Sequence, residues 1–316
     1  MPAAVKPTVL VVGATGKQGG GTINGLLADK SPAAQNIKIL ALTRDASSPR
    51  AKALAAKSDN IEIIEGDQLK PAAIFASLPK GSVTDLFLVT VPPKEEPQAI
   101  PFIDEAIAHG VQNIVFASVE RGGDDRSWTN PTDVPHFAEK YNIEVHLRDV
   151  AAKAESPVTW TILRPAAFMD NLKPGGQFCA IMVSMWSISL KNTKKLQMIA
   201  TSDVGLWAAD SIVKRIAANG KETPYTNKAF GLAGTEVTLT EMRAEFKRIV
   251  GKESPWAWWI FGRMLLLFVS DMGRMFRWFD REGFGADINQ LRTAGPGPAP
   301  KTLEQWLRTE SGWVKE

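Results

Sequence analysis

The chain has 316 residues, a formal net charge of +3, 44% hydrophobic residues and 22% charged residues. Its length allows one large domain or two smaller ones, and its composition is ordinary for a globular protein. The charge is too small, and too evenly spread, to predict direct nucleic-acid binding. A single cysteine, Cys179, excludes an intrachain disulfide framework, and residues 1–7 lack the apolar core of a signal peptide. We therefore expect a cytoplasmic protein, with a nuclear location left open.

The residues from Thr8 to Gly20 organise the predicted fold. The apolar run at 9–12 predicts a strand buried on both faces, and a helical pattern follows the glycine triplet that begins at Gly13 and recurs every third residue. Glycines let the backbone turn sharply and approach a pyrophosphate closely, and a helix N-terminus offers unpaired N–H groups. This strand–turn–helix order predicts a dinucleotide site.

Apolar runs and helical patterns alternate through the first half of the chain. The runs predict strands at 9–12, 37–43, 61–64, 86–91, 114–117 and 158–163. The helical patterns lie after the glycine turn and at 51–56, 71–78, 98–109 and 136–150, with a predicted loop at 122–135. This alternation predicts an α/β fold with a doubly wound, Rossmann-like parallel sheet, whose ligand lies at the carboxyl ends of the strands.

Beyond residue 165 the alternation ends. We predict a dinucleotide-binding domain over 1–165 and a smaller, mostly helical substrate or partner region over 166–316, with a strand near 231–239 returning to the first domain. A capped helix is expected at 240–250 and a capping box at 302–305.

The segment 256–269 is largely apolar but contains Arg263 and is shorter than the roughly 20 residues of a membrane-spanning helix. It predicts a core or subunit-interface helix. A helix lying on a membrane surface is the weaker alternative, because its tryptophans favour that boundary.

The end of the second predicted strand bears on cofactor choice. An arginine there holds the 2′-phosphate of NADP, whereas an acidic residue binds the ribose of NAD. Arg44 favours NADP(H), because a guanidinium offers a planar, permanently charged fork of donors. Asp45 follows directly and keeps NAD(H) open. Lys17, inside the glycine turn, adds a second phosphate contact or points into water.

Together these motifs resemble the NmrA-like family, a group of atypical short-chain dehydrogenase/reductase relatives. The residues that carry the resemblance are 13–20, 43–44, 66–68, 136–140 and 164–171, and the segments 275–279 and 283–288 are similar to fungal members. The resemblance spans nearly the whole chain. It implies a bound nicotinamide dinucleotide.

The resemblance also implies a role for individual positions. These are Gly13, Ala14, Thr15, Gly16, Lys17, Gln18 and Gly19 at the pyrophosphate, Thr43 and Arg44 at the 2′-phosphate, Asp67 and Gln68 at the adenine, Thr90, Val91 and Pro92 along the ribose, Lys140 at the nicotinamide ribose, and Phe168, Met169 and Asn171 over the nicotinamide.

The candidate catalytic residues depart from the pattern of the wider superfamily. The wider superfamily uses Tyr-x-x-x-Lys, in which the tyrosine is the proton donor. In this chain Lys140 has a histidine, His136, one helical turn before it, where the tyrosine would stand. Lys140 is the first candidate for proton transfer, and His136 and Ser118 are weaker ones. Each also has a purely structural interpretation. The three histidines are scattered, and we expect no metal site.

Two functions follow from these features. The first is an NADPH-dependent reductase of a carbonyl or conjugated double bond in a small apolar molecule. The second is a redox-sensing regulator, in which the bound dinucleotide controls a monomer–dimer equilibrium or the binding of a transcription factor or another protein. The missing tyrosine favours the second.

Overall fold

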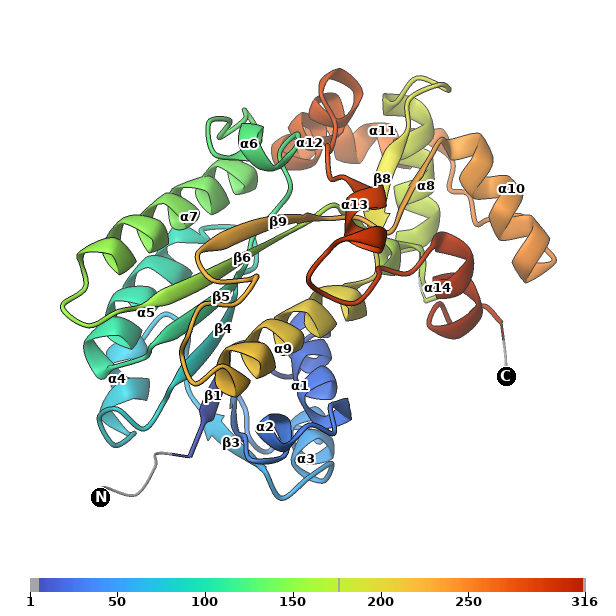
Figure 1. The fold of residues 1–316 in the computed structure, drawn as a ribbon. Coiled ribbons are helices and arrows are strands. Elements are labelled where there is room, and N and C mark those ends of the chain that lie inside the picture. The colour runs from blue at the N-terminus through green and yellow to red at the C-terminus, as the bar shows by residue number, and fades with distance from the viewer. Residues whose placement is uncertain (1–5, 176, 315–316) are drawn as a thin grey trace.

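The computed structural model describes residues 6–175 and 177–314, with the side chains of Trp259 and Phe261 left out. Residues 1–5, which belong to the N-terminal segment where we expect no signal peptide, lie outside the described part. Figure 1 shows a twisted sheet with helices on both faces, and a second group of elements gathered beyond one end of that sheet.

The main sheet has seven strands in the order β3-β2-β1-β4-β5-β6-β9, and every neighbouring pair is parallel. Its strands are β1 (Thr8–Val11), β2 (Lys38–Thr43), β3 (Ile61–Glu65), β4 (Asp85–Val89), β5 (Asn113–Ala117), β6 (Thr159–Pro165) and β9 (Lys228–Leu232). The order reverses between β1 and β4, which makes the carboxyl ends of these two strands the expected ligand crevice. The predicted Rossmann-like α/β fold is confirmed.

Successive residues of β1 point to opposite faces of the sheet, and each face has its own core. Val9 and Val11 pack with Ile23 and Trp207 on one face. Leu10 and Val12 pack on the other. The first face is covered by α1 (Lys17–Ala28), α2 (Pro32–Gln35), α3 (Pro49–Ala55) and α9 (Thr201–Ala217), and the second by α4 (Pro71–Ala76), α5 (Glu96–His109) and α7 (Pro135–Lys153).

The C-terminal region forms a separate small layer. It contains a three-stranded sheet of β7 (Ala167–Phe168), β8 (Leu196–Ile199) and β10 (Thr235–Val237), and a short 3₁₀ helix at Met169–Leu172. Its helices are α8 (Phe178–Ser189), α10 (Leu239–Val250), α11 (Trp259–Phe268), α12 (Ser270–Arg281), α13 (Ile288–Thr293) and α14 (Leu303–Thr309). The predicted capped helix and the predicted capping box are both present, and α10 as well as α14 begins with a capping box.

Two sequence-based predictions of local structure were wrong in detail. The strand expected at 231–239 is split, because β9 ends at Leu232 and the next strand, β10, pairs with β8 in the small sheet instead. The predicted loop at 122–135 contains one helical turn, α6 (Asp124–Ser127). Both segments are placed by contacts with distant parts of the chain, which local patterns do not report.

Helix α9 comes from the second half of the sequence but packs directly on α1. The two helices meet through glycines: a Cβ on Gly205 would lie 2.5 Å from the Thr22 nitrogen and 2.7 Å from the Gly21 Cα. A side chain at Gly205 would push the two backbones apart. The layer around the main sheet is therefore completed by elements from beyond residue 165.

The helix in the apolar segment 256–269, predicted to lie in the core or at a subunit interface, is not buried in the core. Its Trp258, Leu267 and Phe268 side chains are exposed, at 73%, 71% and 79%. The opposite side of α11 packs on α8, where Gly262 lies against Ser184, Met185 and Ile188. Among the described residues, no helix is long and apolar enough to span a membrane.

Candidate functional site

The turn between β1 and α1 has the geometry that its glycines predict. Gly13 has a φ of +65°, in the left-handed region that favours glycine, and a Cβ on Gly19 would overlap the Gly13 carbonyl. Helix α1 begins after Gly16 without a side-chain cap and without an acidic residue in its first turn. Its N-terminal N–H groups and positive dipole end are therefore available to an anion.

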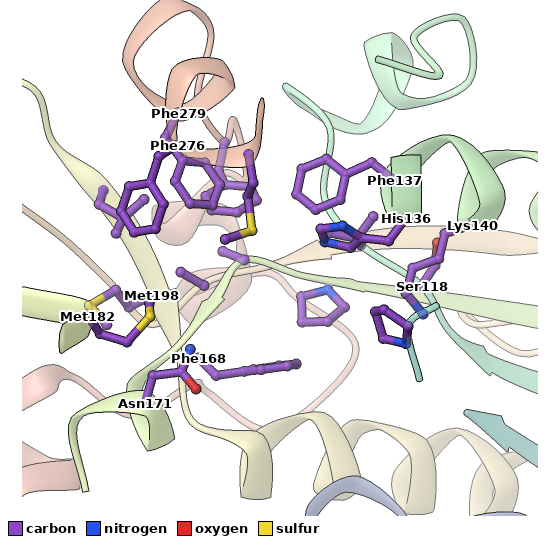
Figure 2. Close-up of a pocket in the computed structure, with 18 of the residues that line it drawn as sticks. Ser118, His136, Phe137, Lys140, Phe168, Asn171, Met182, Met198, Phe276 and Phe279 are labelled. Atoms are coloured by element: carbon purple, nitrogen blue, oxygen red, sulfur yellow. The ribbon is translucent and has the colours of Figure 1, made fainter. Parts of the chain in front are cut away.

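A cavity of about 290 Å³ lies beyond this turn, between the sheet and the C-terminal region. The predicted site residues Gln18, Thr90, Val91, Pro92, Ser118, His136, Lys140, Phe168 and Asn171 all line it. The rest of the wall is mostly apolar and comes from the second half of the chain: Met182, Trp186, Leu196, Met198, Met275, Phe276, Phe279 and Phe284. In Figure 2 the polar group, with Lys140 and Ser118, faces Met182, Met198 and Phe276 across the cavity. One wall is thus polar and the other is suited to an apolar molecule.

Lys140 belongs to a small buried cluster of polar side chains. Its Nζ is 3.0 Å from Thr90 Oγ1, 3.2 Å from the Ala117 carbonyl and 2.8 Å from Glu95 Oε2. Glu95 is fully buried, also accepts a hydrogen bond from the Thr90 hydroxyl, and has no partner for Oε1 among the described residues. All three ammonium protons therefore have acceptors at the ends of β4 and β5. Any ribose or substrate contact of Lys140 must replace one of them.

Ser118 belongs to a second buried cluster. Its hydroxyl donates to Glu144, whose carboxylate lies 2.7 Å from Arg121 Nη2 and 2.8 Å from Arg164 Nη2. All three charged side chains are fully buried. Burial opposes the charge on Glu144, but the two guanidiniums outweigh it and hold the pKa of that carboxyl below its ordinary value. Ser118 is thus committed to a structural network at the edge of the cavity.

His136 is the second residue of α7 and lines the cavity. Its Nδ1 lies 2.7 Å from Asp271 Oδ2 on α12, so this pair joins the Rossmann layer to the C-terminal region. Burial raises the pKa of Asp271, but the neighbouring His136 outweighs it and leaves that pKa below its usual value.

Several predicted cofactor residues lie outside this cavity. Ala14, Thr15, Gly16 and Lys17 line a neighbouring cavity of about 390 Å³. Thr43, Arg44, Asp67 and Gln68 line neither of the two. Met169 is fully buried in the core of the C-terminal region and does not line this cavity. The Gln68 amide donates to the Val89 carbonyl at 3.0 Å, which fixes the end of β4.

The turn and the polar wall fit a dinucleotide. Gln18 Oε1 is buried, faces the cavity wall and has no partner among the described residues, although buried polar atoms are normally paired. The glycine packing brings backbone N–H groups close to the same place. A ligand with both phosphate oxygens and donor groups satisfies these atoms.

Sequence reasoning missed three acidic residues of the site. Glu95 pairs with Lys140, Asp271 pairs with His136, and Asp170 lies 3.9 Å from Lys17 and accepts a hydrogen bond from the Thr201 nitrogen. Asp170 lies inside the segment 164–171 that carried the family resemblance, so its position could have been noticed. The other two are brought in by loops and by α12, with no local signal.

Cys179 is buried, and burial raises the pKa of its thiol to about 11, so it packs as a small apolar residue. Within the described ranges, no group of three potential metal ligands occurs.

The curated relatives found by sequence comparison include these two. One is an NmrA-like family domain-containing protein of Dictyostelium discoideum, 28% identical over 166 residues, which cover 51% of this chain and 52% of that protein. The match therefore spans about half the length of that relative. The other is a (4-alkanoyl-5-oxo-2,5-dihydrofuran-3-yl)methyl phosphate reductase of Streptomyces griseus, 26% identical over 248 residues, which cover 77% of this chain and 74% of that enzyme.

Solved structures have the same fold. The NADPH-dependent quinone oxidoreductase QOR2 of Escherichia coli, complexed with NADPH, gives a TM-score of 0.67 at 22% identity, covering 95% of this chain and 98% of that one. NmrA, a negative transcriptional regulator in complex with NADP, gives 0.65 at 14% identity, covering 98% and 96%. A further NmrA structure contains NAD. The model of the NmrA-like family matches residues 5–306, and this chain therefore belongs to the NmrA-like family.

Proposed function

We propose that the protein is an NADPH-dependent reductase of a carbonyl or conjugated double bond in a small apolar molecule. The observation that carries the proposal is the single cavity that joins the polar residues at the strand ends to an apolar wall from the C-terminal region. The reductase of Streptomyces griseus and the quinone oxidoreductase of Escherichia coli support it as relatives of that chemical class.

The cofactor that we propose is NADP(H), with NAD(H) as a weaker ligand. The turn at 13–19 would hold the pyrophosphate, Arg44 the 2′-phosphate, and the wall at 90–92 the ribose. When bound, the cofactor supplies the hydride, and the protein supplies binding, orientation and a proton.

Lys140 is the proposed proton donor, since its ammonium is the charged group at the polar end of the cavity. Its three acceptors hold it in one place. Glu95 would hold the ammonium in place, the developing oxyanion would take the proton, and the Lys140–Glu95 pair would then be restored from solvent. His136 is the alternative donor, because it lines the same cavity one helical turn away.

Turnover of NADPH tests the proposal. Purified protein is given NADPH and a panel of quinones, enones and aromatic aldehydes, and the loss of NADPH absorbance is followed. We expect oxidation with at least one compound. In the paired variant Lys140→Met/Glu95→Gln, which avoids leaving a buried carboxylate without its partner, turnover should fall by about 100-fold or more, the usual contribution of a general acid. Dinucleotide binding should be kept.

The parallel variant His136→Gln separates the two donors. If turnover is lost there and kept in Lys140→Met/Glu95→Gln, the proton comes from the histidine. If no compound is reduced by the unmodified protein, the reductase proposal fails.

The second candidate function is a dinucleotide-sensing regulator. It is favoured by a specific observation: neither tyrosine lines the cavity, since Tyr225 is buried in the core beside Trp207 and Tyr141 lies near Arg121. The Lys140 and Ser118 side chains are also fully engaged. A sensor would bind NADP(H) without turnover and would change its oligomeric state, or its affinity for a protein partner, between the oxidised and reduced forms.

A further inference from the structure

One face of α11 is apolar and uncovered. Ile260, Met264, Leu267 and Phe268 are spaced four, three and one residues apart, which places them on one side of a helix, and their side chains are 42%, 50%, 71% and 79% exposed. We call these four residues the α11 face. Just before the helix, Trp256 and Trp258 are 45% and 73% exposed. Val269, at the end of the helix, and Ile188, on the adjacent α8, are 40% and 39% exposed, whereas Leu69 and Val314 stand far from this segment in the sequence.

The α11 face is not an unfinished part of the core. The other side of the helix already packs on α8 through Gly262, which lies close enough to the Ser184–Met185 backbone that little room remains. Figure 1 shows α11 beside α8 and α12 at the outer edge of the C-terminal region. The exposed parts of these four side chains therefore face water in the described part of the chain.

The charge around the face is positive. Residues 256–281 contain four arginines and two aspartates, and α11 itself has no acidic residue. Asp271 is paired with His136, and Arg281 with Asp133. Among the described residues, Arg263, Arg274 and Arg277 form no ion pair with a carboxylate, and Arg274 donates to the Asp133 carbonyl instead. Arg263 is exposed and flanks the apolar stripe beside Ile260 and Leu267, where its long apolar stem can cover the stripe while its guanidinium reaches outward.

We propose that the α11 face docks the protein on the surface of a lipid bilayer that contains anionic lipids. Large apolar residues on one helix face, tryptophans at its boundary and arginines beside them are the features that place a helix in the interface plane of a bilayer. Anionic headgroups attract basic residues near the surface. A helix of 10 residues is only about 15 Å long, so it lies on the bilayer and does not cross it.

A second copy of the chain fits this face less well. In a two-fold pair the same patch meets itself. α11 carries Arg263 but no acidic residue, so a second α11 would offer this guanidinium no carboxylate. An anionic lipid headgroup, by contrast, pairs with each arginine separately.

Vesicle sedimentation with the full-length protein tests the proposal. The vesicles are phosphatidylcholine alone, or phosphatidylcholine with phosphatidylglycerol. We expect binding to the mixed vesicles, and about a tenfold loss of binding in Leu267→Ser/Phe268→Ser, since two large apolar side chains no longer insert. Leu69→Ser is the matched control, because Leu69 is 58% exposed but lies beside α4 and should leave binding unchanged. Arg263→Glu should reduce binding to the mixed vesicles more than to phosphatidylcholine alone.

Folding of each variant is checked by circular dichroism and thermal unfolding, which exposed positions should change little. The proposal is overturned if the unmodified protein stays in the supernatant with both kinds of vesicle, or if Leu267→Ser/Phe268→Ser binds as well as Leu69→Ser. It is also overturned if analytical ultracentrifugation shows a dimer that only the α11 variants dissociate, because a second copy would then be the occupant. The binding assay needs no NADPH turnover, so its outcome is independent of the reductase proposal.

Discussion

Arg44 lies exposed just after the end of β2, where a 2′-phosphate is expected. Asp45, its competitor in the sequence, is used locally: its carboxylate accepts hydrogen bonds from the Ser47 nitrogen at 2.8 Å and the Ser47 hydroxyl at 2.6 Å, and these contacts lower its pKa. Asp45 is therefore engaged within its own loop, whereas Arg44 makes no side-chain hydrogen bond or ion pair within the described part of the chain.

We therefore predict that Arg44→Ala weakens NADPH binding by about 10- to 100-fold, the value of one charge-assisted, bidentate contact. NADH lacks the 2′-phosphate, so its binding should change little. Titration calorimetry of both cofactors measures the difference, with Arg148→Ala as a control for the loss of a remote positive charge. Equal losses for NADPH and NADH would refute the assignment of Arg44 to the phosphate.

The buried cluster of Glu144 with Arg121 and Arg164 gives a second prediction. Removing one partner of a buried ion network leaves uncompensated charge, so Glu144→Ala should lower the free energy of unfolding by about 3–5 kcal/mol. Urea unfolding at neutral pH measures this loss. The control is Glu62→Ala, which breaks the exposed pair with Lys38 and should cost less than about 1 kcal/mol. Similar losses in the two variants would contradict the prediction.

The same carboxylate predicts a pH dependence. The pKa of Glu144 lies below its ordinary value of 4.5 in the folded protein, so its contribution to stability is present above that value. As the pH falls below it and toward the folded pKa, the contribution is lost. The difference in unfolding free energy between the unmodified protein and Glu144→Gln should therefore be constant near neutral pH and shrink in acid. A difference that grows in acid would mean that the carboxyl is destabilised in the folded state.

At the scale of elements, the close contact between α1 and α9 depends on the absence of a side chain at Gly205. Gly205→Ala places a Cβ 2.7 Å from the Gly21 Cα, so the two helices must move apart, and we expect a loss of about 1–3 kcal/mol in unfolding free energy. The matched variant is Gly21→Ala, at the same contact, whose Cβ would meet only ordinary neighbours at 3.5 Å or more. It should be neutral or slightly stabilising, because alanine favours a helix over glycine. Thermal unfolding of the two variants compares them directly, and equal effects would rule out the close contact.

How much of these elements could be predicted depends on the range of the contacts. The turn at Gly13 was predictable because its strand, glycines and helix follow one another in the sequence. The partners of Lys140 were not: Glu95 becomes buried only when the loop after β4 folds against α7. The largely apolar run at 256–269 predicted a helix but could not say which way its side chains face, because a short apolar helix has the same composition whether it is buried or exposed.

At the scale of the whole molecule, the predicted boundary at residue 165 has a testable consequence. A fragment of residues 1–165 lacks β9, which pairs along β6, and α9, which covers Ile23 and Leu26 on α1. We predict that this fragment does not fold cooperatively, since a large apolar face of the sheet is left in water. Chemical unfolding monitored by tryptophan fluorescence and circular dichroism tests it, with the full chain as the reference. A cooperative transition in the fragment would establish 1–165 as an independent domain.

The glycine contact between α1 and α9 has a further consequence for ligand binding. Thr201, at the start of α9, is joined through Asp170 to the β7 side of the cavity, and Lys17, at the start of α1, approaches the same carboxylate. Two backbones in direct contact have no flexible side chains between them to absorb sliding. The distance between the glycine turn and the cavity is therefore fixed in the ligand-free protein. Ligand association should then proceed with little reorganisation of the backbone, as in a preorganised receptor.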